Sequence, residues 1–215
     1  AFLDEVKLND SNNIISLETV GYSSSGRVIR AIVISDNPGT PEGEPAIRLT
    51  GGIHGSEMIS VELMIRFIEY LTYNYDKDVE VTDLIKNRYI VVIPVLNPDG
   101  LAKQNRNNNN SVDLNRNFIY EEIAGVIDVN YASYQPESYS MAMFSNSNIF
   151  HLSATFHSGA VLLNMPFDYG RESAGVAPVE NTLVKAFGKA YTKAGTFLSN
   201  PDLYQSIYME DGTIN

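Results

Sequence analysis

The chain has 215 residues, a formal net charge of −11 and no cysteine. This length is enough for one substantial domain with a buried core, and the absence of cysteine excludes disulfides and thiolate metal sites. The negative charge argues against a nucleic-acid partner, because phosphate binding depends on clustered Lys and Arg. No apolar run approaches the roughly 20 residues of a membrane-spanning helix.

The first half of the chain predicts a strand pair, a third strand and a long helix. Residues 14–20 and 27–35 are rich in β-branched side chains and predict a hairpin through "GYSSSG". Residues 46–51 predict another strand. Apolar residues in 58–74 recur three and four positions apart, which predicts a helix.

The second half predicts two more strands and one further helix. Residues 87–100, "NRYIVVIPVLNPDG", contain a continuous apolar run that is typical of a buried strand in a parallel sheet, ending in a turn. Residues 148–160 predict a strand that stops at Gly159, and 178–195 predict a helix that opens with Pro and closes with Gly. Strands separated by helices predict an α/β fold with a mostly parallel sheet and right-handed crossovers.

Polar residues follow three of the predicted strands. His54 follows the strand that ends near Gly51, Asn97 to Gly100 follow the buried strand, and His157 lies at the end of the strand after it. In open α/β sheets the ligand binds beyond the carboxyl ends of the strands. We therefore expect these polar clusters to meet at one edge of the sheet.

The histidines restrict which metal site the chain can form. Only His54, His151 and His157 are present, and a catalytic zinc needs three protein ligands, of which two His and one Glu are a known set. His54-x-x-Glu57 can supply two ligands from one turn, and His157 at a strand end is the preferred third. His151 lies within the strand and is interpreted as structural. The alternative is a polar turn with an exposed Glu57 and a hydrogen-bonded, structural His157.

Seven stretches of the chain resemble the zinc metallocarboxypeptidases, and most closely their carboxypeptidase N/E (regulatory) branch. In chain order they are "GYSSSGRVIRAIVISDNPG", "EPAIRLTGGIHGSE", "IPVLNPDG", "NRNNNNSVDLNRNF", "QPES", "LSATFHSGAVLLNMPFDYG" and "YMEDGTIN". The resemblance covers nearly all 215 residues. It implies an α/β fold with a mixed, mostly parallel central sheet flanked by helices. It also implies removal of a C-terminal amino acid from peptides or proteins.

The resemblance also assigns roles to individual residues. His54, Glu57 and His157 would hold one Zn²⁺, which polarises the scissile carbonyl and activates water. Arg106 would stabilise negative charge on the carbonyl oxygen. The remaining assignments concern substrate binding: Asn115 and Arg116 would bind the terminal carboxylate, and Asp168 would favour C-terminal Arg or Lys.

Each substrate-side role has a competing interpretation. Arg106 could be a solvated basic residue in a polar loop, Arg116 a surface residue paired with Asp113, and Asp168 a turn residue before Tyr-Gly. The resemblance further implies a secreted, secretory-pathway or periplasmic location.

The chain departs from the family pattern beyond "DGTIN". The mobile Tyr and the catalytic Glu of the family would follow this stretch, and no residue of the chain matches them. We therefore expect residues 1–215 to be a catalytic domain that is incomplete at its C-terminus and inactive by itself. Two other functions stay open: a catalytically inactive module that binds zinc or peptide, and a zinc amidohydrolase that acts on acylated amino acids.

Overall fold

The computed structural model describes residues 2–118, 121–123, 126–128, 131–159, 163 and 181–194. The chain divides into two compact units, Ala1–Gly159 and Ala160–Asn215. In the second unit the described structure is the helix α6 (Asn181–Ala194), which confirms the helix predicted over 178–195. The predicted residue Asp168 lies outside the described residues.

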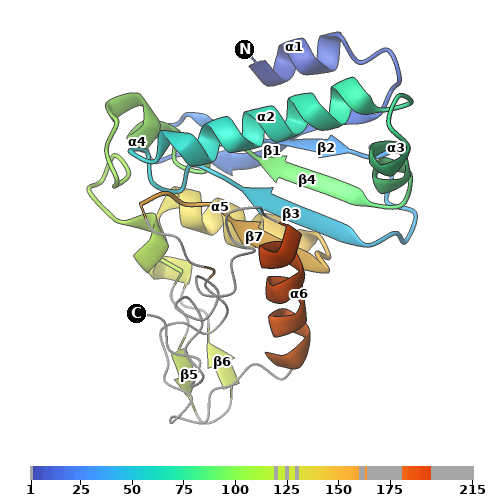
Figure 1. Ribbon diagram of the computed structural model, residues 1–215. Helices are drawn as coiled ribbons and strands as arrows, with labels where there is room; N and C mark the ends of the chain where they lie inside the picture. The colour runs from blue at the N-terminus through green and yellow to red at the C-terminus, as the bar shows by residue number, and fades with distance from the viewer. Residues whose placement is uncertain are drawn as a thin grey trace. The chain divides into compact units, whose positions relative to one another are not determined.

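The first unit contains a central sheet with helices on both sides (Figure 1). Its strands are β1 (Ile15–Tyr22), β2 (Val28–Ile34), β3 (Ala46–Thr50), β4 (Tyr89–Ile93) and β7 (Leu152–Thr155). Its α-helices are α1 (Phe2–Leu8), α2 (Met58–Asn74), α3 (Val79–Lys86), α4 (Pro98–Lys103) and α5 (Pro136–Ser147). Two 3₁₀ turns, η1 (Leu114–Arg116) and η2 (Tyr131–Ser133), and a short pair of strands, β5 (Glu121–Ile123) and β6 (Val126–Asp128), complete the described elements.

The sheet is mixed, with strand order β1-β2-β4-β3-β7. β1 pairs antiparallel with β2, which confirms the predicted hairpin, and β2 also pairs antiparallel with β4. β3 pairs parallel with both β4 and β7. The described sheet is thus parallel in the half that contains β3 and antiparallel in the half that contains β1. Its parallel strands end at the same edge.

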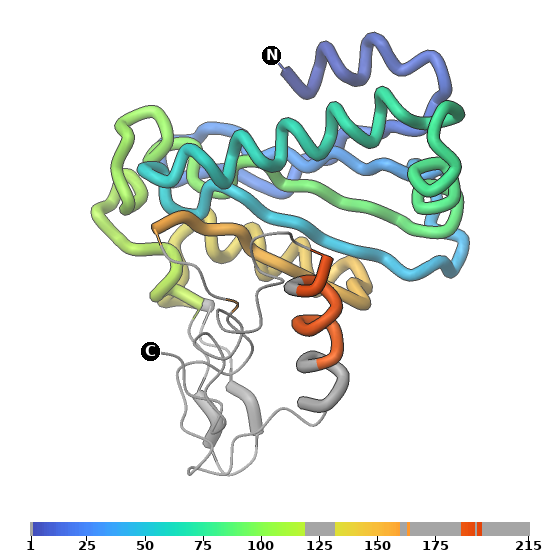
Figure 2. Tube along the Cα trace, in the orientation of Figure 1, coloured from blue at the N-terminus to red at the C-terminus, as the bar shows by residue number. Residues whose placement is uncertain are grey.

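Alternate residues of the strands pack against opposite helices, because successive strand side chains point to opposite faces. Figures 1 and 2 show α2 on one side of the sheet and α5 on the other. The α2 side buries Ile32, Ile34, Ile90 and Val92 of the sheet against Met64, Ile68 and Leu71 of the helix. The α5 side buries Ala31, Val33, Val91 and Ile93 against Met141 and Phe144. Burial on both faces explains why β4 is a continuous apolar run.

One predicted boundary shifts by a few residues, and another is confirmed. The strand predicted within 87–100 is β4, which ends at Ile93, and the turn predicted after it contains the first residues of α4. The helix predicted over 58–74 coincides with α2.

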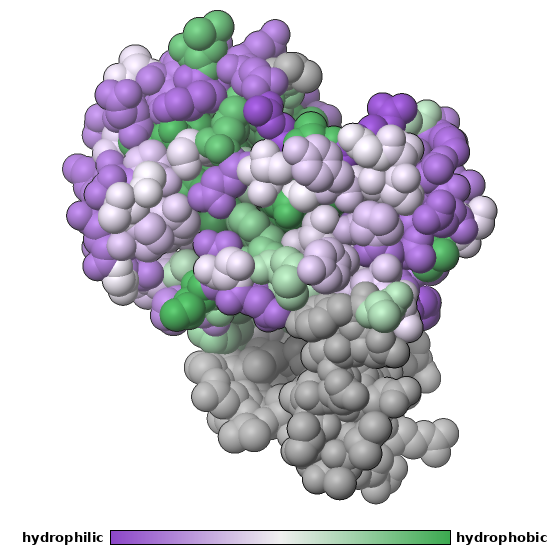
Figure 3. Space-filling view, turned by 180° about the vertical axis from the view of Figure 1, so that it is seen from behind, coloured by the Kyte–Doolittle hydropathy of each residue, from purple (hydrophilic) through white to green (hydrophobic). Residues whose placement is uncertain are grey.

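One face of the first unit is mainly polar. On the face drawn in Figure 3, hydrophilic residues predominate and apolar residues show as smaller patches between them. In the described part of the chain, no helix has both the length and the apolar character needed to cross a membrane.

Candidate metal centre and substrate site

The candidate site lies beyond the carboxyl ends of β3, β4 and β7. β3 ends at Thr50 and leads to His54, β4 ends at Ile93 and leads to Asn97, and β7 ends at Thr155 and leads to His157. Parallel neighbours bring these three exits to one edge of the sheet. The convergence predicted from the strand ends is therefore present.

The turn that carries His54 packs directly against the start of α4. A Cβ at Gly55 would lie 1.9 Å from the carbonyl carbon of Gly100, so only glycine fits at this position without a shift. The buried Asn97 side chain donates to the carbonyl of Ile53 at 3.3 Å and accepts from the Gly100 N–H at 2.8 Å. These contacts hold the residue before His54 against the turn that follows β4.

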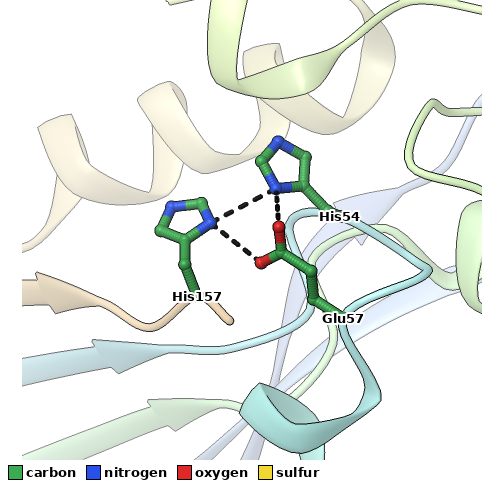
Figure 4. A group of neighbouring side chains, drawn as sticks. All are labelled: His54, Glu57 and His157. Atoms are coloured by element: carbon green, nitrogen blue, oxygen red, sulfur yellow. Dashed lines mark hydrogen bonds and ion pairs between the residues drawn. The ribbon is translucent and has the colours of Figure 1, made fainter. Parts of the chain in front are cut away.

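His54, Glu57 and His157 form a cluster that could hold a metal ion (Figure 4). The Nδ1 atom of His54 is 2.7 Å from Glu57 Oε1, and the Nδ1 atom of His157 is 3.0 Å from Glu57 Oε2. The two Nδ1 atoms are 3.2 Å apart. Among the described residues, this is the cluster of His and acidic side chains with candidate ligand atoms within 4.8 Å of one another.

The donor atoms of this cluster suit a zinc ion. Two ligand atoms about 2.1 Å from an ion, and separated by a tetrahedral angle, are about 3.4 Å apart, somewhat more than the observed separations of 2.7, 3.0 and 3.2 Å. Both ring nitrogens of His54 face a carboxylate oxygen, Nδ1 that of Glu57 at 2.7 Å and Nε2 that of Asp113 at 3.1 Å. With a metal bound at the cluster, the single N–H of the neutral ring would lie on Nε2 and donate to Asp113. Nδ1 would then present its lone pair to the metal, between Glu57 and His157.

Asp113 links the cluster to the neighbouring polar segment. Besides His54, its carboxylate accepts from Arg106 Nε at 2.9 Å and from the Asn115 N–H at 2.9 Å. Burial alone would raise the pKa of this carboxyl, but the hydrogen bonds from Arg106, His54 and Asn115 outweigh burial and lower it. Asp113 is therefore a carboxylate that orients the His54 ring.

Glu57 is held ionised by its surroundings. Burial acts to raise its pKa, but the backbone N–H of Ser158, 3.1 Å from Oε2, together with His54 and His157 lowers the pKa below its usual value. Glu57 also occupies the N-cap position of α2, yet its side chain makes no capping hydrogen bond. Its carboxylate faces the histidines instead.

The other predicted residues lie on the segment around Asp113. The guanidinium of Arg106 approaches the cluster, with NH1 3.5 Å from Glu57 Oε1, and is about half exposed. Asn115 and Arg116 belong to η1, which Asp113 caps, and Arg116 is exposed. The ion pair of Asp113 is with Arg106, whereas the competing interpretation paired it with Arg116.

His151 lies apart from this group of side chains. Its ring atom Nδ1 accepts from the backbone N–H of Ala46 at 3.0 Å, and its backbone N–H donates to the Ala46 carbonyl at 2.9 Å. Both bonds extend the pairing of β3 with β7, which agrees with a structural role.

Sequence reasoning missed the contact between Asp113 and His54. The two residues are 59 positions apart, and no spacing rule connects them. The only signal was the position of Asp113 directly before the Leu-Asn-Arg turn, which is typical of an N-cap.

Comparisons with known proteins agree with a zinc site. The sequence model of the zinc carboxypeptidases matches residues 1–214. The chain is 34% identical to human carboxypeptidase D over 224 residues, covering 96% of this chain and 16% of that protein. It is 31% identical to the human carboxypeptidase N catalytic chain, covering 86% of this chain and 48% of that protein. The chain thus spans less than half the length of these relatives.

A solved structure shows the same fold. The carboxypeptidase A of Helicoverpa armigera superimposes with a TM-score of 0.71 at 23% identity, over 89% of this chain and 51% of that one. The predicted fold class and the resemblance to the carboxypeptidase N/E branch are confirmed by these matches. The chain belongs to the zinc carboxypeptidase family.

Proposed function

We propose that this chain supplies the zinc-binding and carboxylate-binding part of a carboxypeptidase that removes a C-terminal residue from peptides. The observation that carries the proposal is the convergence of His54 Nδ1, His157 Nδ1 and the Glu57 carboxylate within hydrogen-bonding distance of one another. These residues, which come from two turns about 100 positions apart, would hold the metal. Asp113 would fix the orientation of His54.

Zinc bound here would polarise the scissile carbonyl and lower the pKa of a water molecule. Arg106 would donate to the carbonyl oxygen as negative charge develops on it, for which its guanidinium beside Glu57 is suitably placed. Glu57 and Asp113 are both engaged with imidazole rings. Neither carboxylate is therefore assigned as the general base.

The substrate carboxylate would bind to Arg116 and Asn115. A planar guanidinium can form two parallel hydrogen bonds to a carboxylate, which distinguishes a peptide terminus from a peptide bond within the chain. Support comes from the position of both residues on η1, one turn from Asp113. Asp168 would give a preference for C-terminal Arg or Lys, and the resemblance further implies a secreted, secretory-pathway or periplasmic location.

Calorimetric titration of the zinc-loaded chain with benzoyl-Gly-Arg and with its C-terminal amide tests carboxylate recognition. We expect the acid to bind at least tenfold more tightly, because the amide lacks the charge that Arg116 pairs with. Replacing Arg116 by Ala removes this difference, whereas Arg66→Ala, which removes an exposed cation on α2, preserves it. Equal binding of acid and amide by the unaltered chain would contradict the proposal.

The same titration separates the alternative functions. Because residues 1–215 are expected to be inactive by themselves, an inactive module is distinguished by assaying the full-length protein, which would then bind the peptide acid without turnover. An amidohydrolase would bind N-acetylarginine in preference to the peptide. A preference for benzoyl-Gly-Arg over benzoyl-Gly-Phe would support the basic specificity assigned to Asp168, and its loss in Asp168→Asn would connect that specificity to this residue.

A further inference from the structure

The segment 105–117 carries Arg106, Asp113, Asn115 and Arg116 but contains little regular structure. Apart from the three residues of η1 it forms no helix or strand. Its one fully buried apolar side chain is Leu114. Hydrogen bonds must therefore hold the backbone of this segment in place, because so little apolar burial is available to do so.

The turn at the centre of the segment is organised by Asn108. Its side-chain Oδ1 accepts from the backbone N–H groups of Asn110 and Val112, both at 3.0 Å. The backbone N–H of Asn108 donates to the Val112 carbonyl at 2.9 Å. These bonds fix the residue directly before Asp113. They also fix the orientation of the amide, since a flipped Asn108 would direct its NH₂ group at two backbone donors.

The NH₂ group of Asn108 therefore points to the start of α5. It donates to Glu137 Oε2 at 3.0 Å, in a contact where both side chains are buried, and to Gln135 Oε1 at 3.0 Å. The other carboxylate oxygen, Glu137 Oε1, accepts the backbone N–H of Ser24 at 2.8 Å and its hydroxyl at 3.0 Å. Glu137 has no solvent exposure, and a buried carboxylate is tolerated only when donors of this kind surround it.

We infer that Glu137 is a positioning residue: through Asn108 it fixes the segment that carries Arg106 and Asp113, and through Asp113 it orients His54. The direction of each hydrogen bond requires this pairing. Asn108 can present only donors to α5, so position 137 must present an acceptor toward it. The functional consequence rests on the proposed function, since it concerns the residues assigned to zinc and substrate. The hydrogen bonds that link Glu137 to the segment through Asn108 are independent of that function.

Exchanging the donor and acceptor across the pair tests this inference. In Glu137→Gln the amide oxygen must stay toward Ser24, which donates to it. The NH₂ group of the new glutamine then faces the NH₂ group of Asn108, and neither can accept. Asn108→Asp places two carboxylates in contact. The double variant Glu137→Gln/Asn108→Asp reverses donor and acceptor, keeps the net charge and restores a hydrogen bond. Gln135, which is partly exposed, would rotate its amide toward the new carboxylate and lose the bond that its Oε1 accepts from Asn110 Nδ2 at 2.9 Å.

The first readout is hydrogen exchange of segment 105–117 in the 215-residue chain. Each single variant should exchange about tenfold faster there, because a buried donor or acceptor loses its partner, while α2 and β4 stay protected. The double variant should return to the parent rate. Asn109→Asp, the same change at an exposed neighbour that faces Lys103, should have no effect.

The second readout is zinc affinity, which a merely structural pair would not change. We expect weaker binding in both single variants, by about tenfold, and recovery in the double variant. Unchanged affinity in every variant, or a double variant as impaired as the single ones, would overturn the inference. If a single variant does not fold, refolding in the double variant supports the pairing and continued unfolding overturns it.

Failure of the proposed function would be recognised separately. A parent chain that binds no zinc would refute that function, and the exchange rates alone would then decide whether Glu137 positions the segment.

Discussion

Replacing Asp113 by Asn should weaken zinc binding without unfolding the chain. The carboxylate accepts from His54, Arg106 and Asn115. Its contact with Arg106 contributes little, since that guanidinium is about half exposed and screened by water. The contact with His54 dominates because the His54 side chain is only 2% exposed. Loss of a carboxylate that orients a ligating imidazole costs about 10- to 100-fold in metal affinity, or about 1.4–2.7 kcal/mol.

Competition with a chromogenic zinc chelator at neutral pH measures this affinity directly. The matched control is Asp78→Asn, which removes the same charge at the N-cap of α3, where Asn is an equally good cap. We expect the control to bind zinc as the parent does. An Asp113→Asn variant with parental affinity would show that Asp113 does not orient the metal ligand, and the assignment of Nδ1 as the ligating atom of His54 would fail with it.

Three further predictions concern stability, each measured by urea unfolding. Asp99→Asn should cost about 2 kcal/mol near neutral pH, because the carboxylate accepts from Ser25 and pairs with Arg27. Burial raises the pKa of Asp99, but the hydrogen bonds from Ser25, Ser23 and Ser24 lower it overall. The deficit is therefore full above pH 3.8 and shrinks as the pH falls through the native pKa; a deficit independent of pH would contradict this. Gly55→Ala should cost about 1–3 kcal/mol by overpacking against Gly100, and a neutral result would refute the close contact. Ile68→Ala, at a fully buried position of α2, should cost about 2–5 kcal/mol, whereas Leu63→Ala at 46% exposure should cost less than 1 kcal/mol; equal losses would contradict the assignment of faces.

The sequence predicted the elements whose patterns are set by burial. The run in β4 is apolar because both faces of the strand are covered, and α2 shows helical periodicity because one of its faces packs on the sheet. Nothing comparable marked α5. Its sequence, "PESYSMAMFSNS", buries only a few residues such as Met141 and Phe144 and is rich in serine. Tertiary packing against β1, where Gly21 leaves room for Ser140, stabilises this helix, although its sequence shows no helical periodicity of apolar residues.

For the candidate site, sequence reasoning found the residues that stand directly at strand ends. His54 and His157 could be predicted from strand order, since parallel strands end at one edge. The contacts that orient them could not. Asp113 meets His54 through a loop, and Glu137 acts on that loop from α5. Both contacts depend on the path of an irregular segment beside the sheet, and no periodic pattern of residues predicts that path.

The N-cap of α2 has a consequence for how such a chain could change over generations. Glu57 leaves the first turn of its helix without a side-chain acceptor, where Ser or Asp would gain about 1 kcal/mol. Selection for heat tolerance in the absence of metal would thus favour replacing the residue that we propose as a metal ligand. If related chains retain glutamate at this N-cap position, they accept a lower free energy of unfolding in exchange for the function of that carboxylate.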